Sequence, residues 1–237
     1  KQPISQYESQ EAPMNFIAHI HTDFPTKFGI PRQSGLVEEL QGLIIFEPEY
    51  RDPAAFKGLE GFSHIWLLWN FSQSERERWS ATVKPPRLGG KRMGVFATRS
   101  PYRPNHIGLS CVRLEGIHMD EHLGPVLQVS GADLMDKTPL YDIKPYVPLA
   151  DCHPEASEGY TRETKIHNLE VEFPHHLLER YPKEKRKAII GVLAQDPRPA
   201  YVRDPDRVYG VAFGGFDVRF TVDKRVLTVR DVVPIGL

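Results

Sequence analysis

Cysteine and long apolar runs are both scarce in this chain. Its 237 residues include only two cysteines, Cys111 and Cys152, and neither belongs to a C-x-x-C pair. That scarcity argues against a disulfide framework and a cysteine-rich zinc site, and it is typical of a reducing compartment. No apolar run reaches the ~20 residues that a membrane helix needs, and the N-terminal KQPISQYESQEAP lacks the apolar core of a signal peptide. We therefore expect a cytoplasmic protein without a membrane segment.

A charge excess of either sign is also missing. The formal net charge is -1, so the total charge does not indicate a nucleic-acid partner. The local distribution differs, because the stretch from Arg76 to Arg113 carries nine Lys or Arg and a single acid, Glu77. Most such runs are solvated loops, whereas clustered cations with aromatic residues between them also suit an RNA backbone. Charge alone leaves both interpretations open.

The familiar catalytic signatures are absent as well. The sequence contains no G-x-G-x-x-G, Walker A, G-x-S-x-G or H-E-x-x-H motif. Its ten histidines are scattered, and no further ligands can be named beside the pairs His19/His21 and His175/His176. We therefore predict no metal site.

Short apolar runs bounded by Pro and Gly dominate the first 155 residues. Runs of strand length span 15–22, 42–48, 64–71, 94–99, 107–117 and 125–134. No convincing amphipathic helix separates them, which disfavours a doubly wound α/β fold and favours a mostly antiparallel barrel or sandwich. The polar stretch 70–93 is typical of a long loop.

The composition changes near Asp151, and a linker-like stretch follows. Residues 170–196 carry helical periodicity that Pro182 divides into two helices. Residues 208–235 alternate like three strands, with hairpin turns at Gly214-Gly215 and Asp223-Lys224. The sequence thus predicts a mostly β protein, with an antiparallel barrel or sandwich domain over 1–155 and a small α+β domain over 156–237.

Two polar segments stand beside the apolar runs. KFGIPRQSG (27–35) can offer backbone and amide hydrogen bonds to a polar ligand. SGADLMDKTPLYDIKPY (130–146) brings Asp133, Asp136 and Asp142 close to Lys144 and Tyr146. Each segment taken singly is explained by ordinary turns, whereas together they favour a shared pocket.

Four strings resemble the TrmO (YaeB/TsaA-like) family. They are GFSHIWLLWNF, KPPRLGGKRMGVFATRSPYRPNHIGLSCVRL, GADLMDKTPLYDIKPY and LAQDPRPAY. The resemblance covers nearly the whole chain and implies a homodimeric tRNA methyltransferase with an all-β barrel. By this resemblance S-adenosylmethionine is the methyl donor, and the acceptor is N6 of N6-threonylcarbamoyladenosine, just 3′ of the anticodon in tRNA.

The resemblance also implies site residues. The implied donor-binding residues are Gln33, Ser34, Gly35, Phe71, Ser72, Arg99, Leu109, Ser130, Gly131, Ala132 and Asp133. The implied tRNA-binding residues are Gln195, Asp196, Arg198, Tyr201 and Arg203. Lys137 departs from the family, which usually has Gly there; the exchange is explained either by a turn that needs no positive φ or by an added cation at the pocket rim.

A general base would assist methylation of N6, because the carbonyl substituent makes this nitrogen a poor nucleophile with an acidic N–H. Asp136, Asp142 and Tyr146 are the candidates, and the sequence does not choose among them. The competing hypothesis is a noncatalytic RNA-binding or nucleotide-binding protein that uses the same barrel.

Overall fold

The computed structural model describes residues 14–73, 78–164, 168–199 and 204–236. Its N-terminal half is a closed barrel with the strand order β1-β2-β7-β6-β3-β8, in which every neighbouring pair is antiparallel. The strands are β1 Ala18–Thr22, β2 Gln41–Phe46, β3 His64–Asn70, β6 Ile107–Asp120, β7 Gly124–Ser130 and β8 Thr138–Pro145. The predicted β-barrel is therefore confirmed.

The alternating apolar residues explain why these strands close on themselves. Ile20, Ile44, Leu67, Val112 and Leu127 all point inward and are buried in one cluster. Side chains along a strand alternate between its two faces, so each strand presents one apolar face to this interior.

Two strand predictions need correction. Residues 138–145, which resembled a series of turns, form β8 and close the barrel between β1 and β3. Residues 94–99 do not form a strand of the barrel. Only Met93–Gly94 (β5) pairs, with Thr82–Val83 (β4), and Val95–Ala97 forms the 3-10 turn η4, which the Thr98 N–H closes by donating to the Val95 carbonyl at 3.0 Å.

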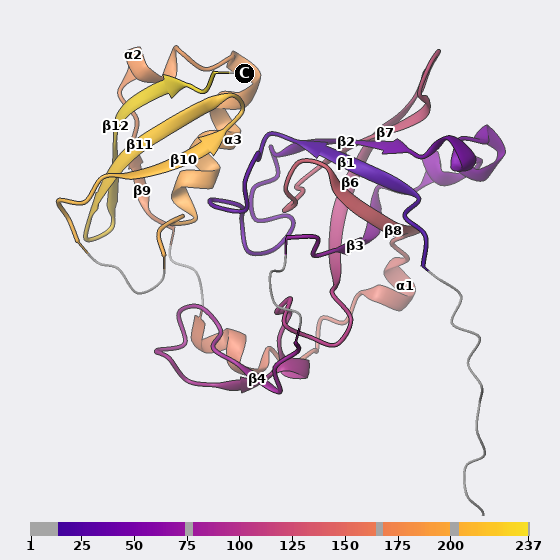
Figure 1. The fold of residues 1–237 in the computed structure, drawn as a ribbon, viewed down its shortest axis with the longest axis horizontal. Helices are drawn as coiled ribbons and strands as arrows, with labels where there is room; N and C mark the ends of the chain where they lie inside the picture. Colours follow the sequence, from indigo (N-terminus) through magenta and orange to yellow (C-terminus); the bar gives the residue numbers. More distant parts are fainter. Residues whose placement is uncertain (1–13, 74–77, 165–167, 200–203, 237) are drawn as a thin grey trace, which may run out of the picture.

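The described residues 78–106, between β3 and β6, therefore form a long excursion outside the barrel. Figure 1 shows it as a magenta lobe beside the barrel, with the β4–β5 ladder in it. It returns to β6 through the proline-rich corner 98–106, where Arg103 Nη1 donates to the Thr98 carbonyl at 2.8 Å. Arg103 thus fixes the shape of the corner.

The C-terminal half is a four-stranded sheet packed against helices, which confirms the predicted C-terminal sheet domain. The sheet order is β10-β11-β12-β9, from β10 Tyr209–Phe213, β11 Phe216–Asp223, β12 Val226–Pro234 and β9 Glu170–Glu172. The helices are α2 His175–Leu178 and α3 Lys183–Ala194, with Pro182 at the start of α3 as predicted. The second hairpin turn is Lys224-Arg225, one residue later than predicted, because Asp223 still pairs with Val226.

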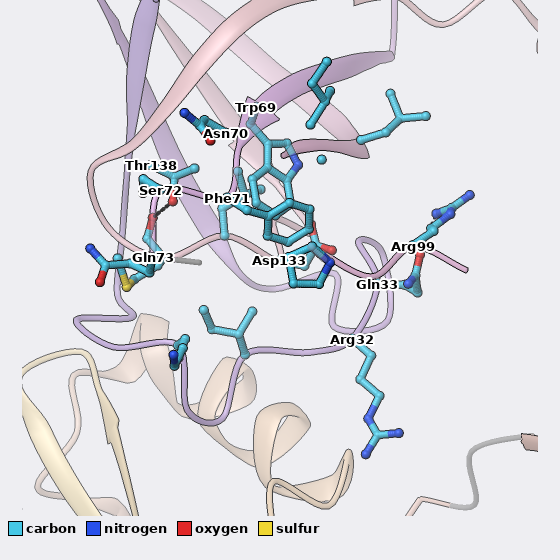
Figure 2. Close-up of a pocket in the computed structure, with 18 of the residues that line it drawn as sticks. Arg32, Gln33, Trp69, Asn70, Phe71, Ser72, Gln73, Arg99, Asp133 and Thr138 are labelled. Atoms are coloured by element: carbon cyan, nitrogen blue, oxygen red, sulfur yellow. Dashed lines mark hydrogen bonds between the residues drawn. The ribbon is translucent and has the colours of Figure 1, made fainter. Parts of the chain in front are cut away.

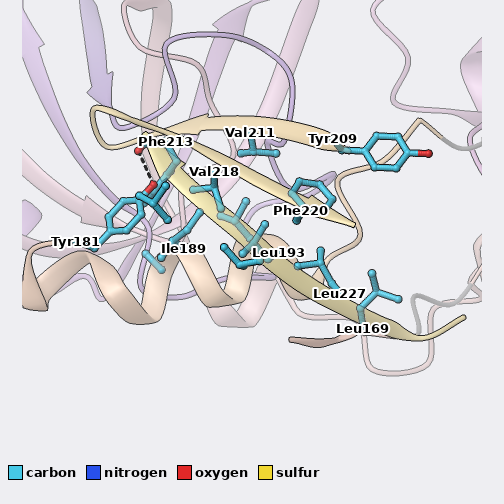
Figure 3. Packing of buried hydrophobic residues seen from close by; sticks show 14 of the residues in the cluster. Leu169, Tyr181, Ile189, Leu193, Tyr209, Val211, Phe213, Val218, Phe220 and Leu227 are labelled. Atoms are coloured by element: carbon cyan, nitrogen blue, oxygen red, sulfur yellow. Dashed lines mark hydrogen bonds between the residues drawn. The ribbon is translucent and has the colours of Figure 1, made fainter. Parts of the chain in front are cut away.

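The two halves share a core. Phe24, Val37 and Leu40, which lie between β1 and β2, pack into the apolar cluster of α3 and the C-terminal sheet. Figure 3 shows part of this cluster, with Ile189 and Leu193 of α3 against Val218 and Phe220 of β11. Lys185 Nζ also donates to Asp23 Oδ1 at 2.6 Å. The C-terminal half therefore docks on the barrel of its own chain. The predicted boundary after residue 155 falls between α1 Pro148–Asp151 and η5 Gly159–Thr164.

No helix within the described residues combines the length and apolar character needed to cross a membrane.

Candidate active site

A pocket of about 910 Å³ opens at one end of the barrel. The end of β3, the start of β6, the start of β8, the segment after β7, the loop 27–33 and the corner 98–103 all contribute to its wall. These pieces meet because antiparallel pairing brings the end of β3 beside the start of β6 and the start of β8. The volume lies within the range of about 300–1,000 Å³ that is typical of small-molecule sites.

An aromatic pair forms one wall of the pocket. The rings of Trp69 and Phe71 lie with their centroids 4.2 Å apart at 56° (Figure 2). Gly108 on β6 makes room for the indole, because a Cβ at position 108 would overlap the Trp69 ring. The pairing of the large Trp69 with Gly108, the smallest residue type, thus produces an apolar surface at the mouth of the barrel.

Asp133 provides the carboxylate of the pocket. Trp69 Nε1 donates to Ser110 Oγ at 3.0 Å, and Ser110 Oγ donates to Asp133 Oδ1 at 2.6 Å. Burial raises the pKa of the Asp133 carboxyl, while hydrogen bonds from the Ser110 hydroxyl and the Ser34 N–H and the nearby charge of Arg99 oppose that rise. Among the described lining residues it is the only carboxylate, so it can receive a hydroxyl or ammonium group of a ligand.

Cationic side chains line the rest of the pocket. They are Lys27, Arg32, Arg99 and Arg103. Arg99 Nη1 donates to Gln33 Oε1 at 2.5 Å, which links the corner 98–103 to the loop 27–33 across the pocket (Figure 2). The site therefore combines an aromatic wall, one desolvated carboxylate and several guanidinium groups that suit a carboxylate or phosphate.

The structure brings about half of the predicted donor-binding residues together in the pocket wall. Residues from distant parts of the sequence line it, namely Gln33, Phe71, Ser72, Arg99, Leu109 and Asp133. Their role in binding a donor stays a prediction, but their convergence is what a shared site requires.

The other predicted donor-binding residues stand behind the wall. The Gly35 N–H donates to the Gly131 carbonyl at 2.9 Å, and Ser34 Oγ accepts from the Cys111 N–H at 3.1 Å. Ser130 Oγ donates to Glu115 Oε1, and Ala132 is buried in the barrel core. These contacts bridge β6 and the end of β7, so they support the wall.

The three candidate bases do not line the pocket. Asp136 Oδ1 accepts from the Thr22 N–H at 3.1 Å. The register with β3 places Asp142 and Lys144 on the outer face of the barrel, where they form an ion pair of 3.0 Å. The Tyr146 ring lies on that outer face against Trp66, at a centroid distance of 5.8 Å, and desolvation raises the pKa of its hydroxyl.

Several residues that line the pocket were not predicted as donor-binding residues from the sequence. They include Trp69, Asn70, Tyr102, Leu134, Met135 and Thr138. Trp69 and Asn70 directly precede the predicted Phe71-Ser72, so the end of an apolar strand was the available signal. Thr138 carried none, because β8 itself was not predicted.

The predicted tRNA-binding segment lies at the end of α3. Gln195 ends the helix, and Arg87 Nη2 from the excursion donates to its carbonyl at 3.1 Å. Asp196 and Arg198 pair with each other through two hydrogen bonds. Tyr201 and Arg203 lie outside the described residues.

Comparison with known proteins places the chain in a family. Residues 19–152 match the family model of the tRNA-methyltransferase O N-terminal domain, and residues 166–235 match that of the TrmO C-terminal domain. The chain belongs to the TrmO family.

Named relatives and solved structures of the TrmO family match most of the chain. An Escherichia coli K12 protein named tRNA (adenine(37)-N6)-methyltransferase is 42% identical over 218 residues, 87% of this chain and 91% of that protein. The RcsF protein of Pseudomonas aeruginosa, described as an S-adenosylmethionine-dependent methyltransferase, is 41% identical over 86% of this chain and 90% of its own. A crystal structure of TrmO from Pseudomonas aeruginosa superimposes with a TM-score of 0.77 at 36% identity, covering 97% of this chain and all of that one.

The residue at which this chain departs from the TrmO pattern has a clear backbone role. Lys137 has φ of 63°, in the left-handed region that favours glycine. The explanation that this turn needs no positive φ is therefore wrong. Lys137 is exposed and does not line the pocket.

Within the described part of the chain, no three His, Cys, Asp or Glu side chains lie close enough together to hold a metal ion.

Proposed function

We propose that this chain transfers the methyl group of S-adenosylmethionine to N6 of adenosine 37 in tRNA, and that this N6 already carries a threonylcarbamoyl group. The observation that carries the proposal is the pocket at the barrel mouth, with its aromatic wall and buried Asp133, in a member of the TrmO family. The E. coli relative is named tRNA (adenine(37)-N6)-methyltransferase, which supports adenine 37 of tRNA as the methyl acceptor.

The residues of the pocket fit such a donor. The volume of about 910 Å³ accommodates a drug-sized molecule and leaves room for an incoming base. Trp69 and Phe71 offer an apolar face for a purine ring. Asp133 suits a ribose hydroxyl or an ammonium group, and Arg99 suits a carboxylate.

The donor supplies an activated methyl group: its bond to sulfur breaks as the bond to N6 forms, the sulfonium becomes a neutral thioether, and the N6 proton passes to water. The main task of the protein is therefore to hold the two reactants in line, which can contribute about 7–11 kcal/mol. The barrel wall formed by Trp69, Gly108 and Leu134 also limits the access of water to the reacting groups.

Cationic residues of the excursion and of the pocket rim suit the phosphates of the RNA. Residues 78–103 contain seven Lys or Arg and no acid. Such a segment gains affinity for RNA by neutralising phosphates, so binding should weaken as the salt concentration rises. This property also fits the competing hypothesis of a noncatalytic RNA-binding protein.

One experiment separates the two hypotheses. The protein is incubated with methyl-labelled S-adenosylmethionine and tRNA that lacks only the N6-methyl group, with tRNA that also lacks the threonylcarbamoyl group as the control. We expect label in the first tRNA and far less in the second. No label, together with no donor binding in calorimetry, would reject the enzyme; equal labelling of both tRNAs would reject the threonylcarbamoyl requirement.

The homodimer and the cytoplasmic location implied by the resemblance are part of the proposal. Light scattering of the purified protein tests the first, and fractionation of cells tests the second. A monomer at micromolar concentration would argue against the dimer.

A further inference from the structure

Two large aromatic side chains lie exposed on the excursion outside the barrel. Trp79 is 52% exposed and Phe96 is 73% exposed. Their rings are parallel to within 19°, with centroids 6.3 Å apart. Soluble proteins rarely leave two such rings side by side in water without a ligand or partner that covers them.

The backbone around the pair is ordered by the short ladder. The Val95 N–H donates to the Ala81 carbonyl at 3.0 Å, next to the pairing of Thr82 with Gly94. Trp79 precedes one side of this ladder, and Phe96 follows the other. The two rings thus flank the two paired strands of one small scaffold, which fixes their relative position.

The segment that carries the pair is cationic, and an acid of η5 lies beside it, with Glu163 Oε2 3.9 Å from Lys91 Nζ. Residues 78–103 include seven Lys or Arg and no Asp or Glu. Arg92 is held on the scaffold, because its Nε donates to Thr82 Oγ1 at 2.8 Å and its Nη2 donates to the Thr82 carbonyl at 3.0 Å. Protein–protein interfaces are depleted in Lys at their centres, whereas single-stranded RNA is bound by aromatic rings beside cations.

Residues next to the pair in sequence connect it to the pocket wall. The Ser80 N–H, next to Trp79, donates to the carbonyl of Tyr102 at 3.0 Å. Tyr102 lines the pocket, and so do Thr98 and Arg99, just beyond Phe96. A base bound against Trp79 and Phe96 would therefore belong to a nucleotide close to the one that enters the pocket.

We propose that Trp79 and Phe96 form a stacking platform for an unpaired nucleobase that neighbours the target adenosine in the RNA loop. The inference rests on the proposed function for the identity of the RNA. It adds the surface on which the RNA loop is bound. Every base has an aromatic face, so the platform contributes affinity and orientation with little preference for sequence.

The test measures binding of a fluorescently labelled anticodon stem–loop RNA by anisotropy. Trp79→Ala and Phe96→Ala should each raise the Kd about 5- to 150-fold, the range for loss of one stacked base. Trp79→Phe and Phe96→Tyr keep a ring and should retain most of the affinity. Donor binding in calorimetry and the slope of log K against log salt should not change, because neither ring touches the pocket or carries charge.

Phe62→Ala is the matched control. Phe62 is a partly exposed aromatic residue that precedes β3, whereas the pocket lies where β3 ends. It should bind the RNA like the wild type. A second control uses RNA with an abasic nucleotide on either side of the target: if the platform holds that base, Trp79→Ala adds little further loss with the abasic RNA.

Wild-type RNA affinity in both alanine variants would overturn the platform, and so would fully additive losses with each of the two abasic RNAs. A change in oligomeric state with unchanged RNA affinity would assign the pair to contact between copies of the chain. If the wild type binds the stem–loop but methylates no tRNA, the proposed function fails while the platform stands. If it methylates tRNA and the variants bind normally, only the platform fails.

Discussion

Arg198 and Asp196 form a two-point ion pair just after α3. Arg198 Nε lies 2.8 Å from Asp196 Oδ1, and Nη2 lies 3.0 Å from Oδ2. Arg87 of the excursion approaches the same carboxylate at 3.7 Å and donates to the Gln195 carbonyl. Arg87 and Asp196 both have positive φ, at 66° and 55°. The predicted tRNA-binding segment is therefore held against the excursion, and Arg198 is paired within the chain.

Arg198→Ala should weaken tRNA methylation mainly through KM for tRNA. The variant removes the cation closest to Asp196 and releases the segment 195–198, while the donor pocket does not include Arg198. Loss of a charge-assisted pair of hydrogen bonds should lower the free energy of unfolding by about 1–3 kcal/mol. Steady-state kinetics and donor calorimetry test this expectation, and an equal loss of donor affinity would contradict it. Arg198→Lys, which cannot form the two-point geometry, should be closer to the Ala variant than to the wild type.

Asp196→Asn should change how stability depends on acid. Burial acts to raise the pKa of Asp196, but the hydrogen bond and charge of Arg198 and the charge of Arg87 together hold it below its ordinary value. Because the pKa of Asp196 is lower in the folded state than in the unfolded state, where it is about 4, its ionisation stabilises the fold at higher pH. That stability is lost as the pH falls through the folded-state pKa. The difference in unfolding free energy between wild type and Asp196→Asn should shrink as the pH falls below about 4. A pH-independent difference would contradict the pairing.

Donor binding should follow the ionisation of Asp133. Burial raises the pKa of this carboxyl, so it becomes protonated at a higher pH than an ordinary aspartate. If the carboxylate receives the donor, affinity falls as the pH drops through that raised pKa. The same raised pKa means that folding loses stability as the pH rises through it.

Asp133→Asn should therefore bind the donor weakly with little dependence on pH in this range, and it should fold at least as stably as the wild type at neutral pH. Calorimetric titration across pH values and thermal unfolding test both expectations. A variant that binds the donor like the wild type would remove Asp133 from the site.

Gly108→Ala should disrupt the aromatic wall. The added Cβ would overlap the Trp69 ring, which must then leave its position beside Phe71 and its hydrogen bond to Ser110. We expect at least a tenfold loss of donor affinity and a stability loss of about 1–3 kcal/mol, as for an overpacked core. Gly61→Ala is the control, because its Cβ would meet nothing within 4 Å. Unchanged donor affinity in Gly108→Ala would show that Trp69 can move without consequence.

Lys137→Gly should stabilise the fold. The left-handed conformation costs a non-glycine residue about 1–2 kcal/mol, partly offset by the greater freedom of glycine in the unfolded chain, so a net gain of about 0.5–1 kcal/mol is expected. Lys137→Ala keeps the backbone cost and removes the charge. If the two variants are equally stable in chemical denaturation, the positive φ of Lys137 does not destabilise the wild-type fold.

Sequence reasoning predicted the barrel well where one face of a strand is apolar. Alternation at Ile20, Ile44 and Leu67 reports which face is buried, and burial is what drives these strands together. It failed at β8, because Pro139, Asp142 and Pro145 are typical of turns. In the structure Pro139 lies at the second position of the strand and Asp142 faces outward, so neither interrupts the closure.

The residues of the site, too, could be predicted from the sequence only in part. Arg99, Phe71 and Asp133 could be named only through the resemblance to the TrmO family, because they lie in or beside the motif strings that carry it. Trp69 and Thr138 could not be separated from ordinary strand residues, since only the register decides which side chain reaches the barrel mouth. The same register places Asp142 on the outer face, away from the pocket.

The sequence by itself determined the mostly β character of the N-terminal half, the helix break at Pro182 and the family, because alternation, proline chemistry and motif strings are local properties of the chain. Only the tertiary structure decided that Arg198 pairs with Asp196, that the excursion carries Trp79 and Phe96 side by side, and that Asp133 is the carboxylate within the pocket. Those relationships depend on which segments closure of the barrel and docking of the C-terminal half bring together, and contacts between distant segments leave no local pattern.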